Sequence, residues 1–151
     1  MAALARITLP LCLLAAGVAA AQTAKPIGQI KTASGAVSIE RSGRVAPTAV
    51  GARVFAADVL MTGPHSSAGV TFEDNSRVSL GPSTHLSLAQ FQFDPTTRQG
   101  SFDLALKRGT LAVKSGLIVQ QTPEAMRVRT PAALLGVRGT EFVVSADGEG
   151  Q

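Results

Sequence analysis

The sequence predicts an all-β fold, either a twisted antiparallel sandwich or a solenoid-like stack of short strands. Apolar and polar residues alternate at period two through most of the chain after residue 27, the pattern of strands with one buried and one wet face. Gly, Pro, Ser and Asn interrupt this alternation about every 8 to 12 residues, as turns between short strands do. No segment shows the longer apolar periodicity of an extended helix.

The chain opens with the features of a secretory signal peptide. Arg6 supplies positive charge, residues 7–18 form a short apolar run, and the alanines at 19–21 resemble a cleavage site. The apolar run is too short for a membrane span of about 20 residues. We therefore expect a signal peptide over residues 1–21, cleavage after Ala21, and a periplasmic or secreted protein whose mature chain has no transmembrane segment.

The rest of the chain is expected to hold a short linker at residues 22–27 and one domain at residues 28–151. The single cysteine, Cys12, lies in the leader, so burial and sheet pairing rather than disulfides must stabilise the domain. The expected strands span residues 28–32, 36–41, 58–61, 69–73, 77–80, 85–93, 102–107, 110–114, 126–130 and 141–144. The alanine-containing segments 50–57 and 130–135 could instead form a helical turn.

One expected strand changes phase. Leu86 and Leu88 occupy even positions, whereas Phe91 and Phe93 occupy odd positions. A straight strand would send the two pairs to opposite faces of the sheet. The pattern predicts either a β-bulge near residues 89–90 or a corner between two sheet layers.

The segment TPAALLGVRGTEFVV, at residues 130–144, predicts one strand that turns tightly into another. Gly136 and Gly139 are expected where the backbone takes a positive φ or approaches a neighbouring segment. Arg138 stands between them and is expected to hold the turn, by hydrogen bonds to carbonyls or to a carboxylate such as Glu141.

Two further segments are considered together with this one: MTGPHSSAGVTFEDNSRVSLGPSTHLSL (61–88) and LALKRGTLAVKSG (104–116). The three segments contain, in order, a Thr-Gly step, an acidic turn, an LGPST strand end, an expected hairpin at 106–109 and the closing GVRGTEF. Together they resemble the FecR-type domain of bacterial envelope proteins. The motif residues, to which we assign a structural role, are Thr130, Pro131, Gly136, Val137, Arg138, Gly139, Thr140 and Phe142.

The resemblance implies an all-β interaction domain of the bacterial envelope. Longer members of the family carry a cytoplasmic anti-sigma segment and a membrane helix, and their periplasmic domain senses the signalling domain of an outer-membrane iron transporter. The sequence shows neither of these parts, so a role in iron-uptake signalling is not expected. Asp147-Gly148 is a hairpin signal with only residues 149–151 after it. We therefore expect a domain without its last strands and an exposed sheet edge near residues 142–144.

Candidate catalytic and metal-binding residues are few. His65 and His85 are the only histidines, and a zinc site usually needs three or four ligands, so no metal or cofactor is expected. Ser66, His65 and Asp58 could form a hydrolytic triad on paper, but no nucleophile motif surrounds the serine. Asp74 is expected to accept a backbone N–H within a turn. These patterns predict that the protein is not an enzyme.

Charge and aromatic content argue against a nucleic-acid partner. The net charge is +4, and the chain has six Phe but no Trp or Tyr on which bases could stack. Arg127 and Arg129 alternate with apolar neighbours, which places both on the outward face of one strand. They are expected on a solvated face, or alternatively on a binding surface for an anionic partner that also includes Val143.

The sequence thus favours an exported, non-enzymatic binding domain that docks another envelope protein through a sheet edge. The alternative is a carrier or scaffold for an envelope glycolipid or peptidoglycan, and a secreted hydrolase ranks last.

Overall fold

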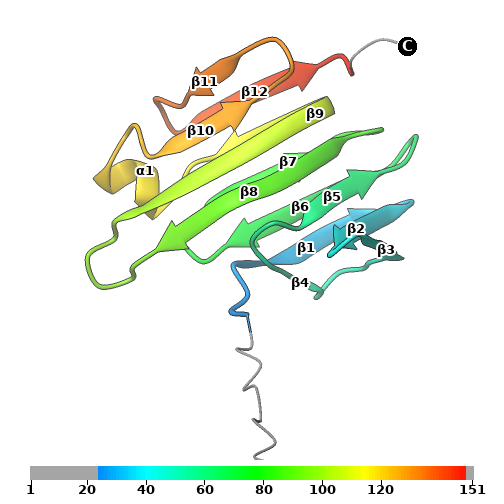
Figure 1. Ribbon diagram of the computed structural model, residues 1–151, viewed down its shortest axis with the longest axis horizontal. Helices are drawn as coiled ribbons and strands as arrows, with labels where there is room; N and C mark the ends of the chain where they lie inside the picture. The colour runs from blue at the N-terminus through cyan, green and yellow to red at the C-terminus, as the bar shows by residue number, and fades with distance from the viewer. Residues whose placement is uncertain (1–23, 149–151) are drawn as a thin grey trace, which may run out of the picture.

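The computed structural model describes residues 24–148, so the expected signal peptide and its cleavage site lie outside the described residues. Twelve strands and one short helix form the domain (Figure 1). Their bounds are β1 Gly28–Ser34, β2 Val37–Arg41, β3 Arg44–Pro47, β4 Arg53–Val54, β5 Val59–Thr62, β6 Ser67–Phe72, β7 Arg77–Leu80, β8 His85–Phe93, β9 Gly100–Lys114, α1 Leu117–Gln121, β10 Met126–Arg129, β11 Leu134–Gly136 and β12 Glu141–Ala146.

All strands join into one curled half-barrel sheet with two layers. Layer A has the order β4-β1-β6-β7-β9-β12, and layer B has the order β3-β2-β5-β8-β9-β10-β11. Strand β9 belongs to both, because its first part pairs with β8 and its last part with β7. Every pairing is antiparallel except that of β10 with β9. The expected all-β antiparallel fold is confirmed.

The core lies between the two layers and follows from the alternation in the sequence. In β6 and β7 every second residue is buried. Phe72 from layer A meets Phe91 and Phe102 from layer B, with ring centroids 4.7 to 5.8 Å apart. Aromatic pairs in this range of edge-on and offset arrangements add to the free energy of simple burial. The three rings therefore join the layers at one end of the core.

The phase change in β8 is a β-bulge, as one of the two sequence interpretations predicted. The register against β9 shifts between Ser87 and Gln90. Leu86 before the shift, Leu88 within it and Phe91 after it are all buried. The extra residue thus returns the aromatic side chain to the core face.

Several elements differ from the sequence predictions. The segments 102–107 and 110–114 belong to the single strand β9, so the hairpin expected at residues 106–109 is wrong. Neither 50–57 nor 130–135 contains a helical turn. The short strands β3 and β4 and the helix α1 were not predicted, whereas β11 corresponds to the first strand expected within residues 130–144. The strands β3, β4 and β11 carry no period-two signal, because all residues of β3 and β11 are exposed and β4 has only two residues.

Candidate interaction surface

The GVRGTEF segment links the two free edges at one end of the half-barrel. Within residues 24–148, strand β11 pairs only with β10 at the end of layer B, and β12 pairs only with β9 at the end of layer A. Figure 1 shows β10, β11 and β12 gathered at this end, opposite β1 to β4. Residues 137–140 cross from one layer to the other. The expected turn therefore exists, but it joins strands that do not pair with each other.

The crossing segment is fixed by burial and by one serine. Val137 is buried and closes the core at this end. The Ser115 hydroxyl donates to the Gly139 carbonyl at 2.8 Å, and the Ser115 N–H donates to the Thr140 carbonyl at 2.8 Å. Gly139 has φ +120°, a conformation that side chains with a Cβ rarely adopt, so this part of the prediction is confirmed.

Gly136 does not share this constraint. It lies in β11 without a positive φ, and a Cβ built on it would meet nothing within 4 Å. The prediction that Gly136 needs special backbone freedom or close approach is therefore wrong.

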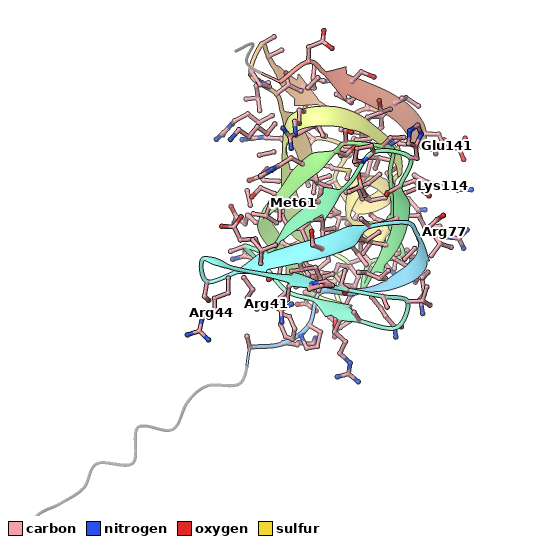
Figure 2. The ribbon with its side chains drawn as sticks, turned by 90° about the vertical axis from the view of Figure 1, so that its right-hand side faces the viewer. Arg41, Arg44, Met61, Arg77, Lys114 and Glu141 are labelled. Carbon is pink, nitrogen blue, oxygen red and sulfur yellow. The ribbon has the colours of Figure 1, made fainter. Side chains whose placement is uncertain are left out.

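Arg138 pairs with a different carboxylate from the one suggested by the sequence. Its Nη2 donates to Glu124 Oε1 at 2.6 Å, and both side chains are mostly exposed. Glu141 instead pairs with Lys114 at 3.5 Å. Lys114 and Glu141 stand in register beside Arg77 on β7, and Figure 2 shows these three charged side chains on the same side of the molecule.

The remaining motif residues support the chain locally. The Thr130 hydroxyl donates to the Ala133 carbonyl at 3.2 Å, and the Ala133 N–H donates back to that hydroxyl at 3.1 Å. This exchange closes the bend that contains Pro131. Phe142 is partly buried against the core. Thr130 and Pro131 thus end β10, while Phe142 anchors β12.

Among the described residues 24–148, strand β12 has a regular row of backbone groups without hydrogen-bond partners. The hydrogen bond from Ser115 N–H to Thr140 fixes the phase of the ladder, because hydrogen-bonded pairs alternate along an antiparallel pair. Residues of β12 at even positions therefore bond to β9. By the same alternation, the N–H and C=O groups of Glu141, Val143 and Ser145 point to the free edge.

Apolar side chains lie beside these edges. Val143 on β12 is 69% exposed, and Leu134 and Leu135 on β11 are 57% and 38% exposed. They account for three of the five large hydrophobic side chains exposed within the described residues. An open strand edge with exposed apolar neighbours is a place where another chain can pair.

A comparison with protein families identifies this region. The family described as FecR protein matches residues 58–151, which include β5 to β12. The chain belongs to the FecR family. No curated protein and no solved structure matches it significantly. Strands β1 to β4 precede the matched FecR region and complete the far ends of both layers.

The two outward arginines of the FecR-family domain line a small hollow. Arg127 and Arg129 are exposed on β10, as their spacing predicted, and they flank a cavity of about 250 Å³ with Leu134 beside it. Neither arginine forms an ion pair within residues 24–148. Asp103 on β9 lies in register with Arg127 and also lines the hollow, so its carboxylate offsets part of the positive charge.

Two side chains of the possible hydrolytic triad are engaged in structural hydrogen bonds. The buried Ser66 hydroxyl accepts the Ala36 N–H at 2.9 Å and donates to the Pro64 carbonyl at 3.1 Å. Both carboxylate oxygens of Asp58 accept hydrogen bonds from Arg41, at 2.8 and 2.6 Å. His65 is an exposed turn residue with φ +56°. The bonds of Ser66 and Asp58 therefore give these two residues structural roles.

Asp74 also has a structural role, as predicted. Its carboxylate accepts the Ser76 N–H at 3.1 Å and the Ser76 hydroxyl at 2.7 Å, within the turn between β6 and β7. Asn75 between them takes φ +65°.

Across residues 24–148, no group of three or more His, Cys, Asp or Glu side chains is placed to hold a metal ion. Within residues 24–148, the structure contains no helix with the length and apolar character that a membrane span requires.

Proposed function

We propose that this FecR-family domain is an exported, non-enzymatic interaction module that docks another envelope protein through the free edge of β12. One observation carries the proposal: a six-residue strand whose outward N–H and C=O groups have no partner in the described part of the chain. An extended segment of the partner would add to layer A as a further strand. Backbone hydrogen bonds would supply affinity, and the exposed Val143 would contribute to selectivity.

The composition of β12 supports this use. Natural sheet edges are commonly blunted by short strands, Pro, Lys or bulges. Strand β12, with the sequence EFVVSA, has none of these features, and its register against β9 is regular. By contrast, β3 ends at Pro47 and β4 has only two residues. The β12 edge is therefore the one suited to accept a strand.

Other observations favour binding over catalysis. The FecR family is generally non-catalytic, and the side chains of Ser66 and Asp58 are engaged in structural hydrogen bonds. The alternative of a glycolipid or peptidoglycan carrier using Arg127 and Arg129 has weaker support, because Asp103 shares their hollow. We therefore place the docking function at the strand edge.

Val143→Pro tests the docking function directly. Proline lacks the outward N–H of residue 143, whereas the even-numbered groups that bond to β9 remain. Val143→Thr is the matched control, because threonine is close to valine in shape and keeps the N–H. In cross-linked pull-downs from envelope extract, we expect the proline variant to lose the partner that wild type and the threonine variant recover.

Thermal melts establish that the variants compared are folded. Equal recovery of the same partner by the proline and threonine variants, both with native-like melting, would contradict strand addition at this edge.

A further inference from the structure

A second surface lies at the opposite end of the half-barrel, before the region matched by the FecR family. It is a groove of about 750 Å³ beside β2, β3 and β4. Apolar side chains contribute to its lining, among them Ile39, Ala46 and Phe55. Volumes of this size are typical of sites for small molecules.

The groove is open because layer A ends early. Ile39 is buried in the core, and Arg41, two residues further along β2, shares its face. The register of β3 places Ala46 opposite Ile39 and Arg44 opposite Arg41, so these β3 side chains also face inward. Layer A offers only the two-residue β4 at this end, and all four residues of β3 remain exposed.

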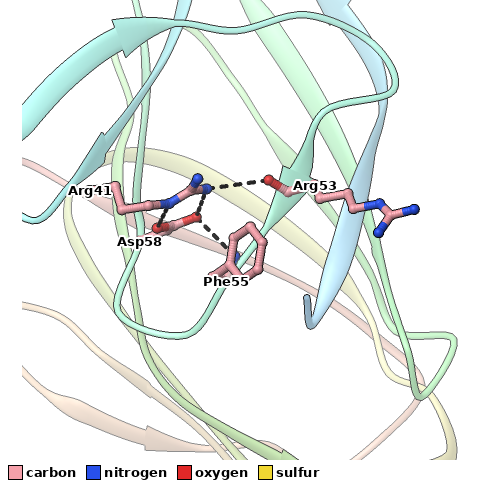
Figure 3. A network of polar contacts seen from close by, with 4 residues as sticks. All are labelled: Arg41, Arg53, Phe55 and Asp58. Carbon is pink, nitrogen blue, oxygen red and sulfur yellow. Dashed lines mark hydrogen bonds and ion pairs between the residues drawn. The ribbon is translucent and has the colours of Figure 1, made fainter. Parts of the chain in front are cut away.

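Arg41 is held in one orientation inside the groove. Its Nε and Nη2 donate to the two oxygens of Asp58 at 2.8 and 2.6 Å, and Nη2 also donates to the Arg53 carbonyl at 3.3 Å (Figure 3). The guanidinium carbon lies 4.4 Å from the centre of the Phe55 ring. Asp58 is 1% exposed and accepts the Phe55 N–H at 2.9 Å as well.

This arrangement leaves one nitrogen of Arg41 available. None of the hydrogen bonds above uses Nη1, and Figure 3 shows the remaining guanidinium nitrogen directed away from Asp58. The Arg41 side chain as a whole is 48% exposed. A guanidinium fixed by a buried carboxylate and an aromatic ring is prepared to donate to an anion with little loss of side-chain freedom.

The charge around the groove is positive. Asp58 offsets the charge of Arg41, but Arg44 also lines the groove and forms no ion pair within the described residues. Arg53 contributes its backbone carbonyl, and its guanidinium points away from Arg41 (Figure 3). No carboxylate of residues 24–148 belongs to the lining. Figure 2 shows Arg41 and Arg44 near one another at this end of the molecule.

From these contacts we propose that the groove binds a single-chain lipid phosphate. The hydrocarbon chain lies over Ile39, Ala46 and Phe55, and the phosphate accepts hydrogen bonds from Arg44 and Nη1 of Arg41. A phosphate supplies several acceptor oxygens for guanidinium groups, and the apolar floor supplies the burial that a free anion cannot use. The site lies at the end opposite to β12, so it does not depend on the proposed docking function.

Calorimetric titration of the purified protein with dodecyl phosphate, below its micelle concentration, tests the site. We expect saturable binding at one site per chain. Arg44→Gln should weaken it at least tenfold. Arg127→Gln is the matched control, because it removes the same charge from the other end and should leave the affinity unchanged.

Two further ligands separate the two parts of the proposal. Inorganic phosphate and dodecyl maltoside should each bind at least tenfold more weakly than dodecyl phosphate. Equal affinity for inorganic phosphate would show an anion site alone, and equal affinity for dodecyl maltoside would show an apolar groove alone; either result overturns the proposal. Equal losses in the Arg44 and Arg127 variants, or no saturable binding by wild type, would also overturn it.

Ala46→Glu offers an independent check that leaves all the arginines in place. Ala46 is exposed, so the substitution should not unfold the domain, and it puts a carboxylate against the bound chain and phosphate. We expect dodecyl phosphate binding to be lost with an unchanged melting temperature. Retained binding in this variant would contradict the assigned position of the ligand.

Discussion

The sheet edges at the two ends of the half-barrel differ in strand length, regularity and polar contacts. At the β3–β4 end the edge strands are short. The buried carboxylate of Asp58 accepts hydrogen bonds from Arg41, and Arg41 also donates to the Arg53 carbonyl of β4. At the β11–β12 end the edge strand is longer and regular, and its ion pairs are exposed. At the first end, the buried carboxylate of Asp58 is fully engaged by Arg41 and by the Phe55 N–H. At the second end, the outward backbone groups of β12 have no partner within the described residues, which is the property expected of a docking surface.

The largest predicted effect concerns the buried ion pair. Asp58→Ala leaves Arg41 without its partner and the Phe55 N–H without an acceptor. Removing one member of a buried pair costs about 3–5 kcal/mol, and because the Arg41 side chain is 48% exposed we expect about 2–3 kcal/mol less unfolding free energy. Urea denaturation measures this loss.

Glu124→Ala is the control at the other end, because it breaks the exposed ion pair with Arg138. Pairs of this kind are typically worth about 0–1 kcal/mol. Similar losses for the two variants would remove the contrast between the ends.

The next prediction concerns the two glycines of the GVRGTEF segment. Gly139 has φ +120°, so Gly139→Val should destabilise the domain by about 1–3 kcal/mol through backbone strain. Gly136→Val is the matched control, since Gly136 lies in a strand with open space around it and should change stability by less than about 0.5 kcal/mol. Thermal melts compare the two. Equal melting temperatures would mean that the crossing segment does not impose this conformation.

The smallest predicted effect is a pH dependence that belongs to neither end. Burial lowers the pKa of His85 from its usual value, nearby Lys107 and Arg108 lower it further, and Glu40 opposes them. Between the lowered folded pKa and the ordinary value near 6.5, the unfolded chain binds a proton that the folded chain does not. Stability should therefore fall on acidification through this window, and His85→Gln should reduce the fall. An identical pH profile in the variant would contradict this assignment.

The sequence predicted the regular strands well, because local alternation determines them. The bounds of β7 and β8 match the prediction, and the phase change between Leu88 and Phe91 indicated the bulge. The sequence predicts two strands in place of β9 because Lys107, Arg108 and Gly109 resemble a turn. Only the pairing of this stretch with residues distant in the sequence shows that the strand continues.

The two surfaces were predictable to different degrees. Period-two spacing placed Arg127 and Arg129 on the outer face, and the hairpin signal at 147–148 drew attention to the β12 edge. The groove gave no such signal, because it depends on Arg41 and Asp58, which stand 17 residues apart and meet only in the folded chain. The partner of Arg138 was missed for the same reason: Glu124 is 14 residues away, whereas the suggested Glu141 is near in sequence.

The sharing of β9 by both layers has a consequence for how the domain opens. Neither layer can lose its inner strand without disrupting the other, so the two should unfold as one cooperative unit. The slowest-exchanging amides of β7 and β8 should then show similar protection from hydrogen exchange, although these strands belong to different layers. A ligand bound at either end of the half-barrel would therefore slow the global unfolding of both layers.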